Sequence, residues 1–217
     1  MENIETKLTQ GEKNFKKAIQ LVKADNFEEA ITCCDKILKS ESSHTLLYRM
    51  TKALKETCEA DMSCIGDSEE LRKKRFKIWV DAAYFFKREY CFEEAAILFD
   101  KALTLCKKKE NIKRLLKEKA RCFERSRGKY DKEALAIRAQ IAENCGSSSK
   151  GRKVRYIGAF DAQVSWGDNA DPRGVLEVGN VYEVKATYLY SEHTKLELVG
   201  FEEKYFNSAS FRLENNG

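Results

Sequence analysis

The sequence predicts a multidomain protein in which an all-α region of helical hairpins precedes a small all-β barrel. Pro172 is the only proline, and only three of the eleven glycines come before Cys145, so long helices are unobstructed there. In that region apolar residues recur every three or four positions, whereas later stretches such as VYEVKATYLY alternate. The boundaries predicted from this change are a helical domain over 1–145, a serine-rich linker over 146–151 and a barrel over 152–217.

Length and composition indicate a globular chain. The 217 residues are 42% hydrophobic and 11% aromatic, which is enough to build a core. No window approaches eighteen consecutive apolar residues, and MENIETKLTQGEKNFKK has no apolar stretch of the secretory kind. We therefore expect a cytoplasmic protein without a membrane-spanning segment.

About seven helices follow from the apolar spacing. The first includes Phe15 to Val22 and the second Phe27 to Leu38. The later ones are expected over 44–60, 68–89, 92–107, 110–127 and 131–144. Asp67 or Ser68 can cap the fourth helix, because two glutamates open it. The short breaks are typical of stacked antiparallel hairpins.

One phrase occurs twice, as NFEEAITCCDKIL from Asn26 and as CFEEAAILFDKAL from Cys91. In the second copy Trp79 and Ala83 precede the phrase, and the first copy has Asn14 and Ala18 at the same spacing. A weaker third copy is GKYDKEALAIRA, with Tyr130 and Ala134. The intervals of bulky and small residues resemble tetratricopeptide repeats, over about 140 residues. The resemblance implies a right-handed superhelix, in which each hairpin buries its apolar face against the next.

Such arrays hold peptides or partner helices on the surface formed by the first helix of each pair, so the resemblance implies a protein-binding function. The residues expected to line that surface in the second copy are Lys77, Val80, Tyr84, Lys87 and Arg88. Their equivalents in the first copy are Phe15, Ile19, Val22 and Lys23, where relatives that clamp a terminal carboxylate have lysine and asparagine. We expect an apolar groove with a basic rim, suited to an acidic or amphipathic segment. Alternatively, Phe15, Ile19 and Tyr84 are core residues covered by another helix.

Cysteines and histidines do not form the patterns of a metal site. The eight cysteines never form close CxxC pairs, and most stand where a helix has a small apolar residue, so packed reduced thiols are expected. His44 and His193 are the only histidines and are interpreted as surface or partly buried polar groups. No metal or cofactor is predicted.

A basic stretch runs from Lys107 to Lys129, with eleven Lys and Arg against three Glu, and RKKR from Arg72 adds a second cluster. A helix of this charge can lie along phosphates, which makes a nucleic-acid-associated protein the alternative function. Lysines mixed with glutamates also describe an ordinary solvated face, and no recognition motif accompanies them. Nucleic acid is therefore not the expected partner.

The C-terminal region predicts about five short strands, with β-branched and aromatic residues in alternation. Gly179, VYEV, Thr194, Gly200 and FNSASF resemble small SH3-like barrels of bacterial and phage proteins, and a barrel hides its strand edges. Asn207 and Ser208 are interpreted as turn formers. The resemblance implies ligand-binding aromatics on loops, for which Trp166, Tyr188 and Tyr190 are candidates, although Trp166 can equally cover the barrel end.

No enzyme is predicted, because the chain contains no GxSxG, phosphate-binding glycine loop or HExxH motif. A carboxylate-based or isolated-cysteine active site would carry none of these motifs. The expected function is that of a non-enzymatic scaffold or adaptor that binds a protein partner through Lys77, Tyr84, Lys87, Arg88 and Trp166.

Overall fold

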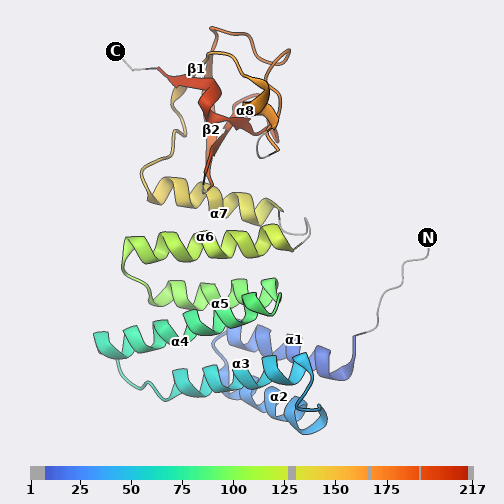
Figure 1. Cartoon of the computed structure of the whole chain (residues 1–217). Helices are drawn as coiled ribbons and strands as arrows, with labels where there is room; N and C mark the ends of the chain where they lie inside the picture. The colour runs from blue at the N-terminus through green and yellow to red at the C-terminus, as the bar shows by residue number, and fades with distance from the viewer. Residues whose placement is uncertain (1–7, 127–130, 166–167, 191, 215–217) are drawn as a thin grey trace, which may run out of the picture. The chain divides into compact units, whose positions relative to one another are not determined.

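The computed structural model describes residues 8–126, 131–165, 168–190 and 192–214. The chain divides into two compact units, Met1–Lys129 and Tyr130–Gly217 (Figure 1). The described residues of the first unit, 8–126, form helices and no strands, and the second unit combines an antiparallel sheet with helices.

The predicted seven helices are confirmed. The first six are α1 Gln10–Lys23, α2 Phe27–Ser40, α3 Leu46–Met62, α4 Glu69–Arg88, α5 Phe92–Leu105 and α6 Lys109–Arg125. Local capping fixes several of their starts: Thr9 and Glu12 form a reciprocal capping box before α1, and the Ser68 hydroxyl accepts the amide of Leu71 at 3.1 Å before α4. Of the two caps proposed for α4, the structure uses Ser68.

The repeated phrase folds into two copies of one hairpin, α1–α2 and α4–α5. At the turn, Asp25 and Tyr90 both have left-handed backbone, with φ of 60° and 62°. The next residues, Asn26 and Cys91, also agree, with φ/ψ of −91°/73° and −90°/72°. The Asn26 and Cys91 amides each donate to the carbonyl five residues earlier, at 2.9 and 3.0 Å. The repeat is therefore structural as well as sequential.

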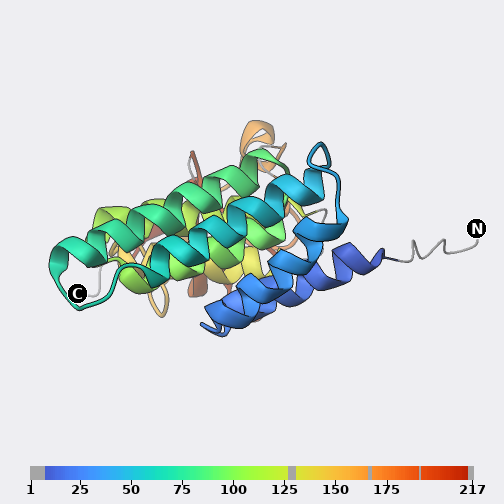
Figure 2. The ribbon, with the colours of Figure 1, turned by 90° about the horizontal axis from the view of Figure 1, so that it is seen from below.

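The two copies pack directly against each other. Phe15 of α1 stacks on Phe86 of α4 with ring centroids 6.2 Å apart, and Phe27 of α2 tilts over Trp79 of α4 at 5.6 Å. Lys101 Nζ of α5 donates to Asp25 at 2.6 Å and to the carbonyl of Lys23 at 3.0 Å. The segment between the copies supplies the single helix α3, which lies beside α4 (Figure 2). It does not form a complete hairpin.

A buried carboxylate joins α3 to α4. Asp61 is only 3% exposed and accepts two bonds from the Arg75 guanidinium, at 2.8 and 2.9 Å. It also accepts a bond from Trp79 Nε1 at 2.9 Å, so the polar edge of the buried indole has a partner. Trp79 is thus enclosed between Phe27 of α2 and Asp61 of α3.

The second unit begins with α7 Asp131–Asn144, which packs against the sheet strand β2. Its elements after α7 are β1 Lys153–Tyr156, α8 Asp161–Ser165, β2 Val181–Leu189, β3 Thr194–Leu198, β4 Phe206–Asn207, a 3₁₀ turn Ser208–Ser210 and β5 Phe211–Leu213. The predicted boundary at 145 assigns α7 to the helical region, whereas its contacts are with the strands of this unit. The unit is therefore not all-β.

The five strands pair antiparallel in the order β4-β3-β2-β1-β5. Val154 lies opposite Tyr182, and Tyr156 lies opposite Phe211. Gly179 has φ of 91° just before β2, as predicted for the turn there. The predicted closure of a barrel is wrong for the described residues, because β4 and β5 remain edges. Both edge strands are so short that they expose few unpaired backbone groups to pairing with another chain.

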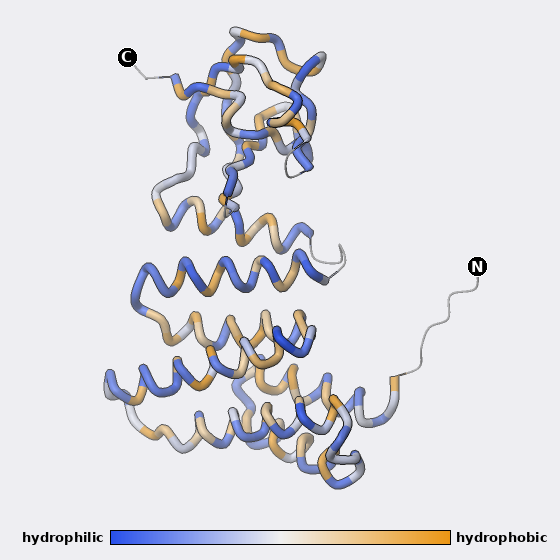
Figure 3. Tube along the Cα trace, viewed as in Figure 1, coloured by the Kyte–Doolittle hydropathy of each residue, from blue (hydrophilic) through white to orange (hydrophobic). Residues whose placement is uncertain are grey.

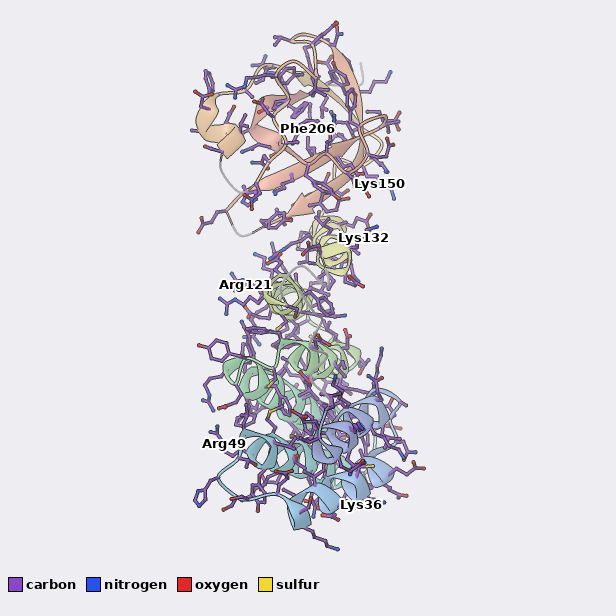
Figure 4. All side chains as sticks on the ribbon, turned by 90° about the vertical axis from the view of Figure 1, so that its right-hand side faces the viewer. Lys36, Arg49, Arg121, Lys132, Lys150 and Phe206 are labelled. Atoms are coloured by element: carbon purple, nitrogen blue, oxygen red, sulfur yellow. The ribbon has the colours of Figure 1, made fainter. Side chains whose placement is uncertain are left out.

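The core of this unit is formed by one buried residue set: Val154, Tyr156, Leu176, Val184, Leu196, Leu198 and Phe206. Figure 4 shows Phe206 inside the strands. The segment 146–151, predicted as a linker, hydrogen-bonds to β2. The amide of Ser149 donates to Thr187 Oγ1 at 2.9 Å, and the amide of Gly151 donates to the carbonyl of Val184 at 2.7 Å.

The expectation of packed thiols agrees with the structure: all eight cysteines are free, and five of them are buried. Burial raises the pKa of Cys34 and of Cys58 to about 12. Across the described helices, none combines the length and apolarity that crossing a membrane requires.

Candidate functional site

A cleft of about 570 Å³ lies along the C-terminal half of α4. Its lining residues are Asp81, Tyr84, Phe85, Lys87, Arg88, Tyr90 and Arg125. We call this set the α4–α6 cleft, because α4 and the turn after it supply all of these residues except Arg125, which ends α6. Three of the predicted partner-binding residues, Tyr84, Lys87 and Arg88, belong to it. Lys77 lies one turn before Asp81, is exposed and is not part of the lining.

An ion pair between Lys87 of α4 and Glu118 of α6 joins the two helices at the cleft. Arg121 donates a second bond to Glu118 at 2.7 Å. Burial alone would raise the pKa of Glu118, but hydrogen bonding and attraction from Lys87 and Arg121 lower it below 4.5. Lys87 is therefore engaged within the protein, and its role at the cleft is to hold α4 against α6.

Tyr84 lines the cleft with a partly exposed ring. The ring packs edge-on against Phe99 with centroids 5.3 Å apart, while the residue stays 38% exposed. Lys87 Nζ lies 5.9 Å from the centroid of the same ring. Burial, and then the charge of Glu118, raises the pKa of its phenol. Tyr84 thus remains a neutral hydrogen-bonding aromatic at physiological pH.

Arg88 and Arg125 supply the free positive charge of the α4–α6 cleft. The Arg88 guanidinium lies 5.7 Å from the centroid of Phe85, and that of Arg125 lies 5.9 Å from the centroid of Phe92. Neither makes an ion pair within the described residues. A neighbouring aromatic ring takes up none of the in-plane N–H donors of a guanidinium, so these donors remain available for an acceptor.

Tyr90 is the feature that sequence reasoning missed. It is 79% exposed and occupies the left-handed turn position that Asp25 has in the first hairpin. Asp tolerates this conformation, whereas a bulky residue there is an outlier that costs about 1–2 kcal/mol. Alignment of the two copies shows that Tyr90 stands where the first copy has Asp25, and this replacement is the sequence feature that could have identified Tyr90. Tyr90 is therefore an exposed aromatic side chain on a strained backbone position beside the cleft.

Tyr90 and Arg125 also border a second hollow of about 550 Å³. That hollow extends from Lys16 of α1 to Ser126 at the end of α6. The ring of Tyr90 meets Phe92 edge-on with centroids 6.0 Å apart. Tyr90 therefore lines both the α4–α6 cleft and the second hollow, and its exposed ring can contact a molecule bound in either of them.

The equivalent surface of the first hairpin is closed. Phe15, Ile19 and Val22 are all buried in the core of the first unit. The alternative that Phe15 and Ile19 are core residues is therefore confirmed, and that for Tyr84 is not, since Tyr84 is partly exposed. The stacking of Phe15 on Phe86 accounts for part of this burial.

The basic stretch forms α6, which is largely hydrophilic along its length (Figure 3). Lys119 pairs with Asp100 at 2.6 Å, and Arg121 pairs with Glu118. Figure 4 labels Arg121 on this helix. Lys113, Arg114 and Lys117 make no ion pair within the described part of the chain.

The aromatic candidates of the second unit have structural positions. Tyr188 lies within β2, is buried, and donates its hydroxyl proton to Glu197 at 2.6 Å. Tyr190 stacks on His193 with centroids 4.6 Å apart and lies under the Arg138 guanidinium at 4.8 Å. Asn207 caps the 3₁₀ turn as predicted, since its Oδ1 accepts the amide of Ala209 at 3.0 Å. Trp166 lies outside the described residues.

Within the ranges that the structure describes, no cluster of three or more His, Cys, Asp or Glu side chains is placed to hold a metal ion. No family model, curated protein or solved structure matches the chain. The chemistry of the α4–α6 cleft is therefore inferred from the residues that line it.

Proposed function

We propose that the protein is a non-enzymatic interaction protein, a scaffold or adaptor that binds a protein partner at the α4–α6 cleft. The observation that carries this proposal is Tyr90, a bulky side chain held at φ of 62° and 79% exposed beside that cleft. A protein keeps such strain where the side chain has a task other than folding.

The chemistry of the cleft supports a peptide segment or partner helix with acidic and apolar residues. Tyrosine and arginine are the residue types that most often dominate binding energy at interfaces. Here Tyr84 and Tyr90 supply ring surface, while Arg88 and Arg125 supply donors for carboxylates. Asp81 is the only carboxylate of the lining, so the cleft has an excess of positive charge.

The fold supports the same proposal at the level of family. Two matched hairpins that stack directly, with tightly buried Ala18 and Ala83 at equivalent positions, are what a tetratricopeptide-like array requires. In such an array α4 is the first helix of its pair, and the cleft lies along the surface of that helix. For the second unit we propose an SH3-like fold, because β5 returns to pair with β1 after a four-strand meander.

The test compares two variants in affinity capture from the native cell, followed by direct binding of the purified partner. Tyr90→Gly combined with Arg88→Glu removes the exposed ring and reverses one charge of the cleft. Lys13→Glu, on the exposed side of α1, is the control for charge reversal. We expect one protein to be retained by the wild type and by Lys13→Glu, and its affinity for the double variant to fall at least tenfold, about 1.4 kcal/mol. Equal affinity for all three proteins would refute the site.

A second candidate function is association with nucleic acid through α6. The observation in its favour is that Lys113, Arg114 and Lys117 make no ion pair within the described residues. We expect no binding of duplex or single-stranded nucleic acid at physiological salt. Retention there, with affinity falling steeply as salt is raised, would favour this function instead.

A further inference from the structure

A separate cavity of about 330 Å³ opens between the N-terminal ends of α4 and α6. Its lining residues are Glu69, Arg72, Lys73 and Phe76 of α4, Leu105 of α5, Cys106, Lys107 and Lys108 of the connection, and Asn111 of α6. It shares no residue with the α4–α6 cleft. Phe76 precedes Tyr84 by two helical turns, which places the two sites about 12 Å apart along α4.

The apolar side of this cavity is preformed. Phe76 and Leu105 both pack against the core of the first unit. Arg72 ties α4 to the end of α5, because it donates from Nη1 to the carbonyl of Leu105, and within α4 it donates from Nε to Glu69 at 3.0 Å. The apolar wall is therefore in place before a ligand binds. Because its side chains do not have to be ordered on binding, this favours affinity.

The polar side of the cavity is positively charged. Glu69 is the one carboxylate of the lining, and it is already held by Arg72 and approached by Lys107 at 3.9 Å. Lys73 and Lys108 make no ion pair within the residues described. The positive end of the α6 dipole adds to their potential, since Lys108 provides no side-chain cap there.

We propose that this cavity binds a compact organic anion. Its apolar body would rest on Phe76 and Leu105, and its anionic group would meet Lys73 and Lys108. A volume near the lower end of the range for ligand sites, with apolar walls and a few convergent cations, fits such a molecule. This binding does not depend on the partner proposed for the α4–α6 cleft.

The test uses 1-naphthyl phosphate as the probe, in calorimetric titrations of the full chain. 1-Naphthol and inorganic phosphate present its two parts separately, and both are expected to bind at least tenfold more weakly. Lys73→Glu with Lys108→Glu should weaken the probe about tenfold or more, whereas Lys13→Glu with Lys17→Glu, the same change of charge on α1, should change it by less than about twofold.

Each contrary result has a definite meaning. Inorganic phosphate binding as tightly as the probe would indicate an adventitious ion only, and 1-naphthol doing so would indicate apolar contact without charge recognition. Equal weakening in both double variants would show long-range attraction without a site. These three results, or no binding of the probe, would overturn the proposal. Circular dichroism and thermal melting verify that the variants are folded.

Cys106 provides a second readout that reports location. This half-buried thiol lines the cavity, with its Sγ 3.6 Å from the carbonyl of Lys108. Bound probe is expected to slow its alkylation by iodoacetamide several-fold, followed by mass spectrometry of the labelled peptide. Cys145, also half-buried but in the second unit, is the internal control and should react at an unchanged rate. An unaltered Cys106 rate at saturating probe would place the ligand elsewhere.

Discussion

Lys87 of α4 and Glu118 of α6 form an ion pair that is largely shielded from solvent, with 19% and 12% of their side chains exposed. The sequence-based expectation treats Lys87 as a partner-binding residue, but its ammonium is committed to α6. The same pair holds the two helices that supply the α4–α6 cleft, and it makes stability depend on pH.

The pKa of Glu118 is lowered from 4.5 in the folded protein, so the unfolded chain binds more protons as pH falls. The stabilisation is complete above the unfolded value and is lost as pH drops through the folded one. Glu118→Gln should therefore lose less stability than the wild type between about pH 7 and about pH 3.5, measured by urea unfolding at each pH. Glu110→Gln, at an exposed position of α6, is the control and should follow the wild type.

At neutral pH, Glu118→Gln should also lower the free energy of unfolding by about 1–2 kcal/mol, because it leaves Lys87 without its carboxylate. A parallel loss of stability with acid in the wild type and Glu118→Gln would contradict the assignment.

Replacement of the buried Asp61 by alanine should destabilise the first unit by about 3 kcal/mol, because Arg75 and Trp79 would lose their acceptor together. Urea unfolding followed by Trp79 fluorescence measures the change. Asp35→Ala removes a more exposed pair, with Lys55 at 2.6 Å, and should lose less than about 1 kcal/mol. Similar losses for both variants would mean that Asp61 is not the junction of α3 and α4.

The backbone strain at Tyr90 predicts an order of stability. Tyr90→Gly and Tyr90→Ala both remove the ring and its contact with Phe92, but only glycine tolerates φ of 62° without strain. The glycine variant should be the more stable by about 1 kcal/mol in thermal or urea unfolding. An alanine variant of equal or greater stability would remove the argument that strain is retained at this turn.

In the second unit, Arg138→Ala should loosen the packing of α7 on β2. Arg138 is 2% exposed, and its guanidinium covers the ring of Tyr190 at 4.8 Å. Hydrogen exchange should become faster in α7 and β2 while remaining unchanged in α1 to α5. Lys132→Ala, on the exposed side of α7, is the matched control. Unchanged exchange in Arg138→Ala would show that other contacts of α7 hold it.

The sequence by itself determined the elements that depend on neighbouring residues. The helix bounds follow from apolar spacing and from caps such as Ser68, and the strands follow from alternation and from turns such as Gly179. The internal repeat was also evident, because the same phrase encodes the same hairpin, with matching backbone at Asn26 and Cys91. All of these features depend on residues that are close together in the chain, so the order of residues in the sequence is enough to predict them.

Only the tertiary structure decided what each surface became. The apolar spacing of Phe15 and Ile19 is compatible with either a groove or a core. The packing of α1 on α4 buries both residues, so they belong to the core. Lys87 and Glu118 are 31 positions apart, so their pairing depended on how α4 and α6 pack. The open edges of the sheet were decided in the same way. Contacts between residues distant in the chain are consequences of packing, which no single stretch of sequence encodes.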